Sequence, residues 1–145
     1  MTKLFAVSLL FFAALPAMAA NDCDAARTLA ANAAAYRDEG LTQEQLRYPL
    51  PPRDYFATDS GNPKNAQLQL MHQIVDELYL DPEVQGDLYA TFKAEQCRLL
   101  SATPAQAADF PSAASKLKAC TPLKGRQRAA CAAEAAGLVV PGNGP

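Results

Sequence analysis

Four cysteines constrain this chain more than any other feature, because they limit how its segments can be joined. They are Cys23, Cys97, Cys120 and Cys131. Four cysteines can pair into two disulfides in three ways. Cys120 and Cys131 flank a predicted turn, "TPLKG", that brings them close together, and Cys23 is then left for Cys97. No spacing gives the close Cys-x-x-Cys pair of a zinc site. We therefore predict two disulfides, and favour this pairing over the other two.

The first residues of the chain have the three parts of a secretory signal peptide. Lys3 supplies a positive charge, residues 4–15 are apolar, and small residues lead to a predicted cleavage after Ala19. The apolar run ends at Pro16, short of the roughly 20 residues that a membrane-spanning helix needs. We therefore expect export to an oxidising bacterial periplasm, where disulfides persist, and a mature protein without a transmembrane segment.

Capping residues and prolines divide the remaining chain into predicted helices. Asn21 or Asp22 can cap the first helix, and Gly40 can end it in a left-handed conformation. Asn62 before Pro63 marks another start, and Asp81 before Pro82 repeats that signal. The predicted helices run over 21–40, a short stretch after Thr42, 63–80, from Pro82 past Leu99, a short stretch from Pro104 broken near Pro111, a stretch ending at Cys120, and 126–136. We expect an all-α, disulfide-stapled bundle.

Side-chain spacing assigns the faces of these helices. The first helix places alanine-rich positions on one side, which permits a close approach of its neighbour; the helix at 63–80 is the most apolar, and we expect it to be central. The predicted inward positions are Ala26, Leu29, Ala33 and Tyr36, then Leu68, Leu70, Met71, Ile74, Val75, Leu78 and Tyr79, then Val84, Leu88, Phe92 and Leu99.

The Cys23–Cys97 pair dictates a topology. In a simple up-down-up bundle these cysteines lie at opposite ends, about 25 Å apart for a helix of roughly 17 residues. A disulfide requires Cα atoms only about 4.4 to 6.8 Å apart. The segment at 41–62, the crossover, must therefore return along the molecule, so that the helix at 63–80 runs parallel to the first and the next helix returns antiparallel. This bridge closes a loop of about 74 residues and should contribute about 4 kcal/mol.

The crossover contains "RYPLPPRDYFATDSGNP" (47–63), a proline-rich stretch without helical period. Its prolines keep the backbone from becoming helix, and we expect Tyr48, Tyr55 and Phe56 to pin it to the bundle. Ordered loops on rigid scaffolds are common contact surfaces. We predict that Tyr48, Tyr55, Phe56 and Arg53 bind a partner.

The composition suggests four divisions: a signal peptide at 1–19, a helical core at 20–101, an arm at 102–137 and a flexible tail at 138–145. The arm ends in a helical hairpin. Because the stretch at 102–119 is rich in alanine and poor in large apolar residues, one interpretation is that it is loosely docked, and the sequence leaves open whether the arm docks on the core.

Catalytic and metal-binding patterns are weak. The single histidine, His72, lies beside Met71 but would need metal ligands from elsewhere, so we expect no metal and no cofactor. No GxSxG motif accompanies it. Adjacent acids point about 100° apart on a helix and cannot flank one bond, so solvated charges explain them. These pairs are Asp38 with Glu39 and Asp76 with Glu77.

Two further acids and a basic cluster complete the candidate residues. Asp54 and Asp59 could be active-site acids together with Tyr55, which leaves a small hydrolase as a remote alternative. A basic cluster around the last predicted turn could attract anions such as lipid headgroups or nucleic acid. It lacks interleaved aromatics, so a solvated turn is the favoured interpretation. It comprises Lys116, Lys118, Lys124, Arg126 and Arg128.

Two resemblances can be stated. The spacing of Cys23, "YRDEGLTQEQ" (36–45), "IVDELYLDP" (74–82) and Cys97 resembles a pattern in uncharacterised small exported helical proteins of proteobacteria. Separately, "CTPLKGRQRAAC" (120–131) is similar to the cysteine spacing of phosphate-starvation-inducible periplasmic proteins. Neither resemblance implies a particular activity.

These patterns together favour a non-catalytic periplasmic interaction module, such as an accessory, inhibitor or immunity-type protein. The alternative is an envelope stress or maintenance protein that acts through the arm and the basic turn.

Overall fold

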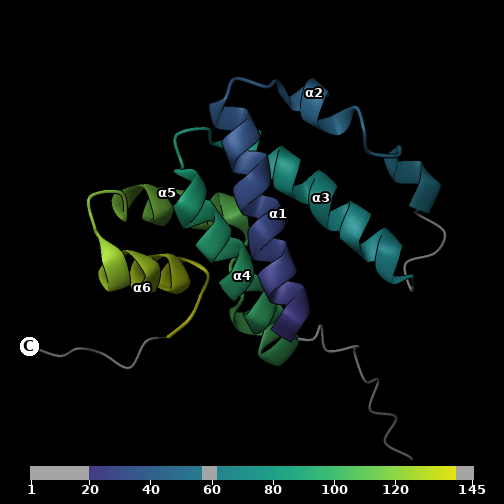
Figure 1. The fold of residues 1–145 in the computed structure, drawn as a ribbon. Helices are drawn as coiled ribbons and strands as arrows, with labels where there is room; N and C mark the ends of the chain where they lie inside the picture. Colours follow the sequence, from purple (N-terminus) through teal and green to yellow (C-terminus); the bar gives the residue numbers. More distant parts are fainter. Residues whose placement is uncertain (1–19, 57–61, 140–145) are drawn as a thin grey trace, which may run out of the picture.

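The computed structural model describes residues 20–56 and 62–139. This part of the chain is helical and contains no strand, which confirms the predicted all-α fold. The elements, shown in Figure 1, are α1 (Ala20–Asp38), α2 (Gln43–Arg47), the 3₁₀ turn η1 (Arg53–Phe56), α3 (Pro63–Leu80), α4 (Gly86–Ala102), the 3₁₀ turn η2 (Pro104–Gln106), α5 (Phe110–Ala119) and α6 (Gly125–Ala135). The predicted signal peptide, Asp59 and most of the predicted tail lie outside the described residues.

Local capping sets several helix ends as predicted. Thr42 and Gln45 form a reciprocal capping box at the start of α2. Asn62 accepts a hydrogen bond of 3.0 Å from the backbone N–H of Lys64 at the start of α3. Gly40 has a φ of +96°, the left-handed conformation expected after a helix end.

Helices α1 and α4 pack closely because small residues line their contact. The buried stripe of α1 is Cys23, Ala26, Ala30 and Ala34, rotated from the predicted face, so that Leu29 and Ala33 lie at its edge and Tyr36 is half-exposed. A Cβ atom at Gly86 would lie only 2.7 Å from the Cβ atom of Ala34. The close approach of α1 to a neighbouring helix, predicted from its alanines, is therefore confirmed. The predicted buried face of α1 was slightly wrong.

Both predicted disulfides are present, and the topology follows the first. Cys23 and Cys97 have Cα atoms 5.4 Å apart, which makes α4 antiparallel to α1. Leu70, in the first half of α3, packs beside this disulfide, while Arg37 near the end of α1 reaches the carbonyl of Leu78 near the end of α3. Helix α3 is therefore parallel to α1, and the crossover that links the two helices in the chain returns along the molecule (Figure 1).

The turn between α3 and α4 is longer than predicted. Helix α4 begins at Gly86, not at Pro82. The side chain of Val84 is buried in the core, and its carbonyl accepts a hydrogen bond of 3.1 Å from Arg37. A helix that started at Pro82 would lose both contacts of Val84, so residues 82–85 form a turn and the helix begins after Gln85. The predicted inner face of α4 is otherwise confirmed, since Leu88, Phe92 and Leu99 are buried.

The C-terminal hairpin, α5 and α6, shares the main core, so the interpretation of a loosely docked arm is wrong. Phe110 packs edge-on against Tyr89 and near Phe92, with ring centroids 5.3 and 5.9 Å away. Cys120 and Cys131 form the second disulfide, with Cα atoms 5.8 Å apart. A few large side chains thus attach this alanine-rich segment firmly to the core, although its composition alone indicated weak attachment.

Pro111 lies in the first turn of α5 rather than breaking a helix. It lies in the first turn, where its missing N–H costs no hydrogen bond, and Asp109 caps that turn by accepting from Ser112. The end of α6 then closes on the preceding loop. Ala108 donates a hydrogen bond of 2.9 Å to the carbonyl of Ala136, and Gly137 passes so near Gln106 that a Cβ atom would lie 1.9 Å from its oxygen.

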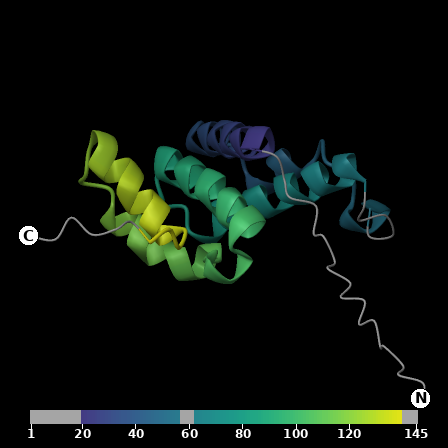
Figure 2. The same ribbon diagram turned by 90° about the horizontal axis from the view of Figure 1, so that it is seen from below.

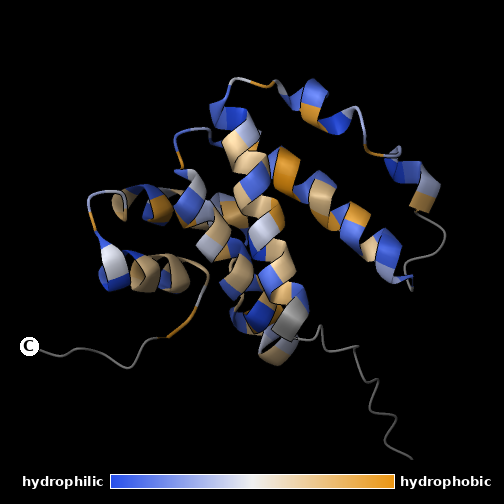
Figure 3. Cartoon of the chain, in the orientation of Figure 1, coloured by the Kyte–Doolittle hydropathy of each residue, from blue (hydrophilic) through white to orange (hydrophobic). Residues whose placement is uncertain are grey.

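The hairpin and the crossover lie on opposite sides of the α1–α4 pair in both ribbon views (Figures 1 and 2). Figure 3 shows strongly hydrophobic positions along α3, whereas α1 and α6 have the paler colour of alanine. The bundle therefore has two differently built flanks, and the crossover flank contains the predicted partner-binding residues.

Candidate functional site

The crossover is clamped to α3 by one carboxylate. Asp76 accepts hydrogen bonds from Arg47 on one oxygen and from Arg53 on the other, and Gln43 approaches it at 3.4 Å. Partial burial of Asp76 would raise its pKa, but the hydrogen bonds and charges of the two arginines outweigh burial and lower the pKa. The clamp is therefore an ionised, charge-assisted contact.

Three further contacts fix the crossover, and they involve α3 residues on either side of Asp76. Tyr79 donates its hydroxyl to the carbonyl of Leu41 at the start of the crossover. The ring Nε2 of His72 lies 2.8 Å from the carbonyl of Pro51, and the ring of Phe56 packs against His72 with centroids 5.7 Å apart. The crossover is thus held at several points along α3.

The structure separates the four predicted partner-binding residues into different roles. Phe56 is buried, with only 2% of its surface exposed, and it alone of the three aromatics pins the crossover. Tyr48 and Tyr55 are 92% and 75% exposed, so the expectation that they pin the segment is wrong. Arg53 is exposed but engaged by Asp76. Tyr48 and Tyr55 are thus available to a partner, whereas Phe56 is covered.

Two hollows are lined by residues of both the crossover and α3. The first, which we call the apolar groove, has a volume of about 260 Å³ and is lined by Leu29, Asn32, Ala33, Tyr36, Leu46, Pro49, Leu50, Met71, Ile74 and Val75. The second, the polar hollow, has a volume of about 350 Å³ and is lined by Arg53, Phe56, Gln69, His72, Gln73, Asp76 and Glu77.

The contact of His72 with the crossover shows which ring nitrogen donates. Because the carbonyl of Pro51 can only accept, Nε2 must carry the hydrogen of that bond. The other ring nitrogen, Nδ1, is buried and has no hydrogen-bond partner among the described residues. The same residues contain no group of three or more His, Cys, Asp or Glu side chains that could hold a metal ion.

The neighbouring acid Glu77 points into the core, and the prediction that Asp76 and Glu77 are solvated charges is wrong. Glu77 is buried and lies 3.0 Å from the ammonium of Lys93, which is itself 2% exposed. Tyr89 donates a hydrogen bond of 2.6 Å to the same carboxylate oxygen, and Gln73 donates to the other at 2.7 Å. Each buried charge therefore has charged and neutral partners, as a low-dielectric site requires.

This buried network reaches the hairpin flank. Lys93 donates to Gln96 at 2.8 Å, and Gln96 donates to the carbonyl of Ala108 at 2.7 Å. Burial lowers the pKa of Lys93 despite the opposing charge of Glu77, and burial also raises the pKa of Tyr89, reinforced by Glu77. Sequence reasoning missed these residues, although the spacing of Tyr89, Lys93 and Gln96 places them on one side of α4.

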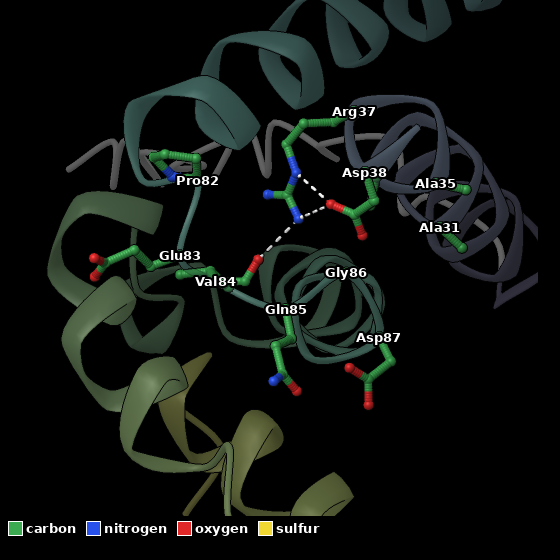
Figure 4. Close-up of a pocket in the computed structure, with 11 residues that line it drawn as sticks. Ala31, Ala35, Arg37, Asp38, Pro82, Glu83, Val84, Gln85, Gly86 and Asp87 are labelled. Atoms are coloured by element: carbon green, nitrogen blue, oxygen red, sulfur yellow. Dashed lines mark hydrogen bonds and ion pairs between the residues drawn. The ribbon is translucent and has the colours of Figure 1, made fainter. Parts of the chain in front are cut away.

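A third depression, between the end of α1 and the start of α4, has a structural purpose. Figure 4 shows that the guanidinium of Arg37, which lines this depression, donates hydrogen bonds to Asp38 and to the backbone carbonyl of Val84. Arg37 also reaches the carbonyl of Leu78, at 3.4 Å. Its donors thus join three segments of the chain.

The predicted basic cluster is partly paired. Lys118 bonds Asp81 at 2.7 Å, and Arg128 bonds Asp87 and the carbonyl of Thr121. Hydrogen bonds from Arg128 lower the pKa of Asp87, against an opposing effect of burial. Two of the predicted basic residues therefore act within the fold.

The fold and this surface define a disulfide-linked, all-α protein with a clamped crossover. No family model, curated protein or solved structure matches the chain. Within residues 20–56 and 62–139, no helix combines the length and apolar character needed to cross a bilayer. Of the acids considered for hydrolysis, Asp54 is exposed and Asp59 lies outside those ranges.

Proposed function

We propose that this chain is an exported, non-catalytic interaction module that binds a protein partner in the bacterial periplasm through its crossover. The carrying observation is that the crossover is clamped to α3 and yet presents Tyr48 and Tyr55 almost free of protein contact. Two disulfides are compatible with an oxidising compartment.

Exposed tyrosines on an ordered segment favour binding for a physical reason. Tyrosine offers a large contact area and a hydroxyl at a small cost in conformational entropy, and it is enriched at interface hot spots. Holding the backbone beforehand reduces the ordering cost of association. The clamp at Asp76 supplies this ordering for both tyrosines, because its arginine partners lie next to Tyr48 and near Tyr55 in the chain.

The alternative of an envelope maintenance protein depended on a detachable arm and a free basic turn. In the structure the hairpin contributes Phe110 and Leu117 to the main core, and Lys118 and Arg128 are paired. No observation therefore favours an envelope maintenance function over partner binding through the crossover.

The experiment is affinity enrichment from periplasmic extract, read by quantitative mass spectrometry. The wild-type protein is compared with Tyr48→Ser/Tyr55→Ser and with a control, Leu80→Ser/Leu100→Ser, which removes two other exposed apolar side chains. We expect a partner that is enriched by the wild type and the control and lost with the tyrosine variant. Identical enrichment by all three proteins would refute the proposal.

A further inference from the structure

We propose that the apolar groove is a binding site for a small uncharged molecule with an aromatic or branched aliphatic body. The site is formed by three segments: α1, α3 and the crossover. It is separate from Tyr48 and Tyr55, neither of which lines it.

The chemistry of the lining selects an uncharged ligand. None of its residues is charged, and the polar side-chain groups among them are the amide of Asn32 and the hydroxyl of Tyr36, both on exposed residues of α1. An ion entering the groove would lose hydration without gaining a countercharge. Asn32 and Tyr36 can bond one polar group of a ligand whose body lies deeper, and Met71 provides a side chain that adapts to different shapes.

The groove stays open because polar contacts, rather than apolar packing, hold its crossover side. Tyr79 fixes Leu41, Asp76 fixes Arg47, and His72 fixes Pro51, so the crossover is tied to α3 on both sides of Pro49 and Leu50. Opposite, Ala33 has too small a side chain to fill the space. The hollow is therefore preformed, as small-molecule sites usually are.

Its size agrees with a compact ligand. An apolar cavity of about 150 Å³ is enough for benzene, and the groove has about 260 Å³. One or two fused rings, or a branched aliphatic group of similar bulk, would fit.

The surroundings favour a free small molecule over a second protein. Of the apolar residues that line the groove, Tyr36 and Pro49 are exposed, and the others are half-buried or buried. A protein laid across the groove would cover mainly its exposed rim at Tyr36 and Pro49, whereas a small molecule inside would contact the buried side chains of Ile74 and Val75.

The test is a titration of the oxidised protein with indole, followed by the methyl NMR signals of Ala33, Leu50 and Met71. We expect saturable shifts at these methyls, and at least tenfold weaker binding of the charged analogue indole-3-acetate. The variant Ala33→Leu, which fills the groove, should weaken indole binding at least tenfold. The control Ala35→Leu, at an exposed position of the same helix, should change it less than twofold.

Thermal unfolding, indole binding by a second variant and sedimentation velocity test whether the groove is open in the free protein and what occupies it. If the groove is open, Ala33→Leu should leave the thermal midpoint of the free protein unchanged or raise it, and Tyr48→Ser/Tyr55→Ser should bind indole normally even if it loses its protein partner. Non-saturable shifts, equal binding by Ala33→Leu, or a fall in its thermal midpoint would overturn the proposal. A dimer in sedimentation velocity that Ala33→Leu dissociates would also overturn it, by assigning the groove to a second copy.

Discussion

The two flanks of the α1–α4 pair are attached by different physical means. The hairpin flank is held by buried apolar side chains such as Phe110 and by a disulfide within the hairpin. The crossover flank is held mainly by ionic and hydrogen-bonded contacts at Asp76, His72 and Tyr79, with Phe56 as its buried aromatic. Apolar contacts should couple the hairpin to global folding, whereas polar contacts should allow the crossover to open locally.

The largest effect is expected on the hairpin flank. Phe110→Ala removes a fully buried ring from contact with Tyr89 and Phe92. It should lower the global free energy of unfolding by about 3–5 kcal/mol, measured by urea denaturation. Ser115→Ala, on the exposed side of the same helix, is the control and should change little. A loss below about 1 kcal/mol would mean that the hairpin is not part of the cooperative core.

The two disulfides should differ in strength because they close loops of different length. The Cys23–Cys97 bridge spans a separation of 74 residues, and the Cys120–Cys131 bridge spans 11. In the chain-entropy model the double alanine variants lose about 4 and about 3 kcal/mol respectively. Urea denaturation of both variants checks the order. The reverse order would indicate that the hairpin bridge prevents more unfolded conformations than its loop length implies.

A smaller and local effect is expected on the crossover flank. Asp76→Asn keeps the shape of the side chain but removes the charge that binds Arg47 and Arg53. Since Asp76 is partly exposed, the loss should be only about 1 kcal/mol. Hydrogen exchange should become faster at the amides of Tyr48 and Tyr55, which bond within the crossover, and remain unchanged in α5. Equal acceleration in α5 would show that the two flanks open together.

The lowered pKa of Asp76 gives this clamp a defined pH dependence. A carboxyl group with a lower pKa in the folded state stabilises that state above its ordinary pKa of about 3.9, and the contribution is lost as the pH falls through the folded value. The difference in exchange between wild type and Asp76→Asn should therefore be constant near neutral pH and shrink below about pH 4. A difference that persists in acid would contradict an ionic clamp.

Local capping chemistry predicted several helix starts correctly, although not the start of α4. Caps at Thr42 and Asn62 start helices where predicted, and the Cys23–Cys97 pair was enough to infer the return path of the crossover. Pro111 was misread because proline both ends helices and suits their first turn, and only the cap at Asp109 distinguishes the two cases. Local rules therefore predicted helices and their connections better than the path of each turn.

Contacts between distant residues could not be predicted from periodicity. Glu77 and Lys93 neutralise each other inside the protein, yet each looks like an ordinary surface charge within its own helix. Asp76 likewise meets Arg47 and Arg53 only because the crossover returns past α3. The orientation of aromatics in a proline-rich loop has no period either, so the sequence could not separate buried Phe56 from exposed Tyr48 and Tyr55.

The smallest effect on stability is expected for substitution of these two tyrosines. Measuring it distinguishes residues of the crossover that stabilise the fold from residues that bind a partner. Tyr48→Ser/Tyr55→Ser should change the free energy of unfolding by no more than about 0.5 kcal/mol, since exposed side chains contribute little to stability. Phe56→Ala, as the contrasting variant, should cost about 3 kcal/mol because its ring is buried against His72. Urea denaturation of both proteins makes the comparison. If the tyrosine variant were as unstable as Phe56→Ala, the tyrosines would be folding residues, and a loss of partner binding in that variant would no longer locate the contact surface.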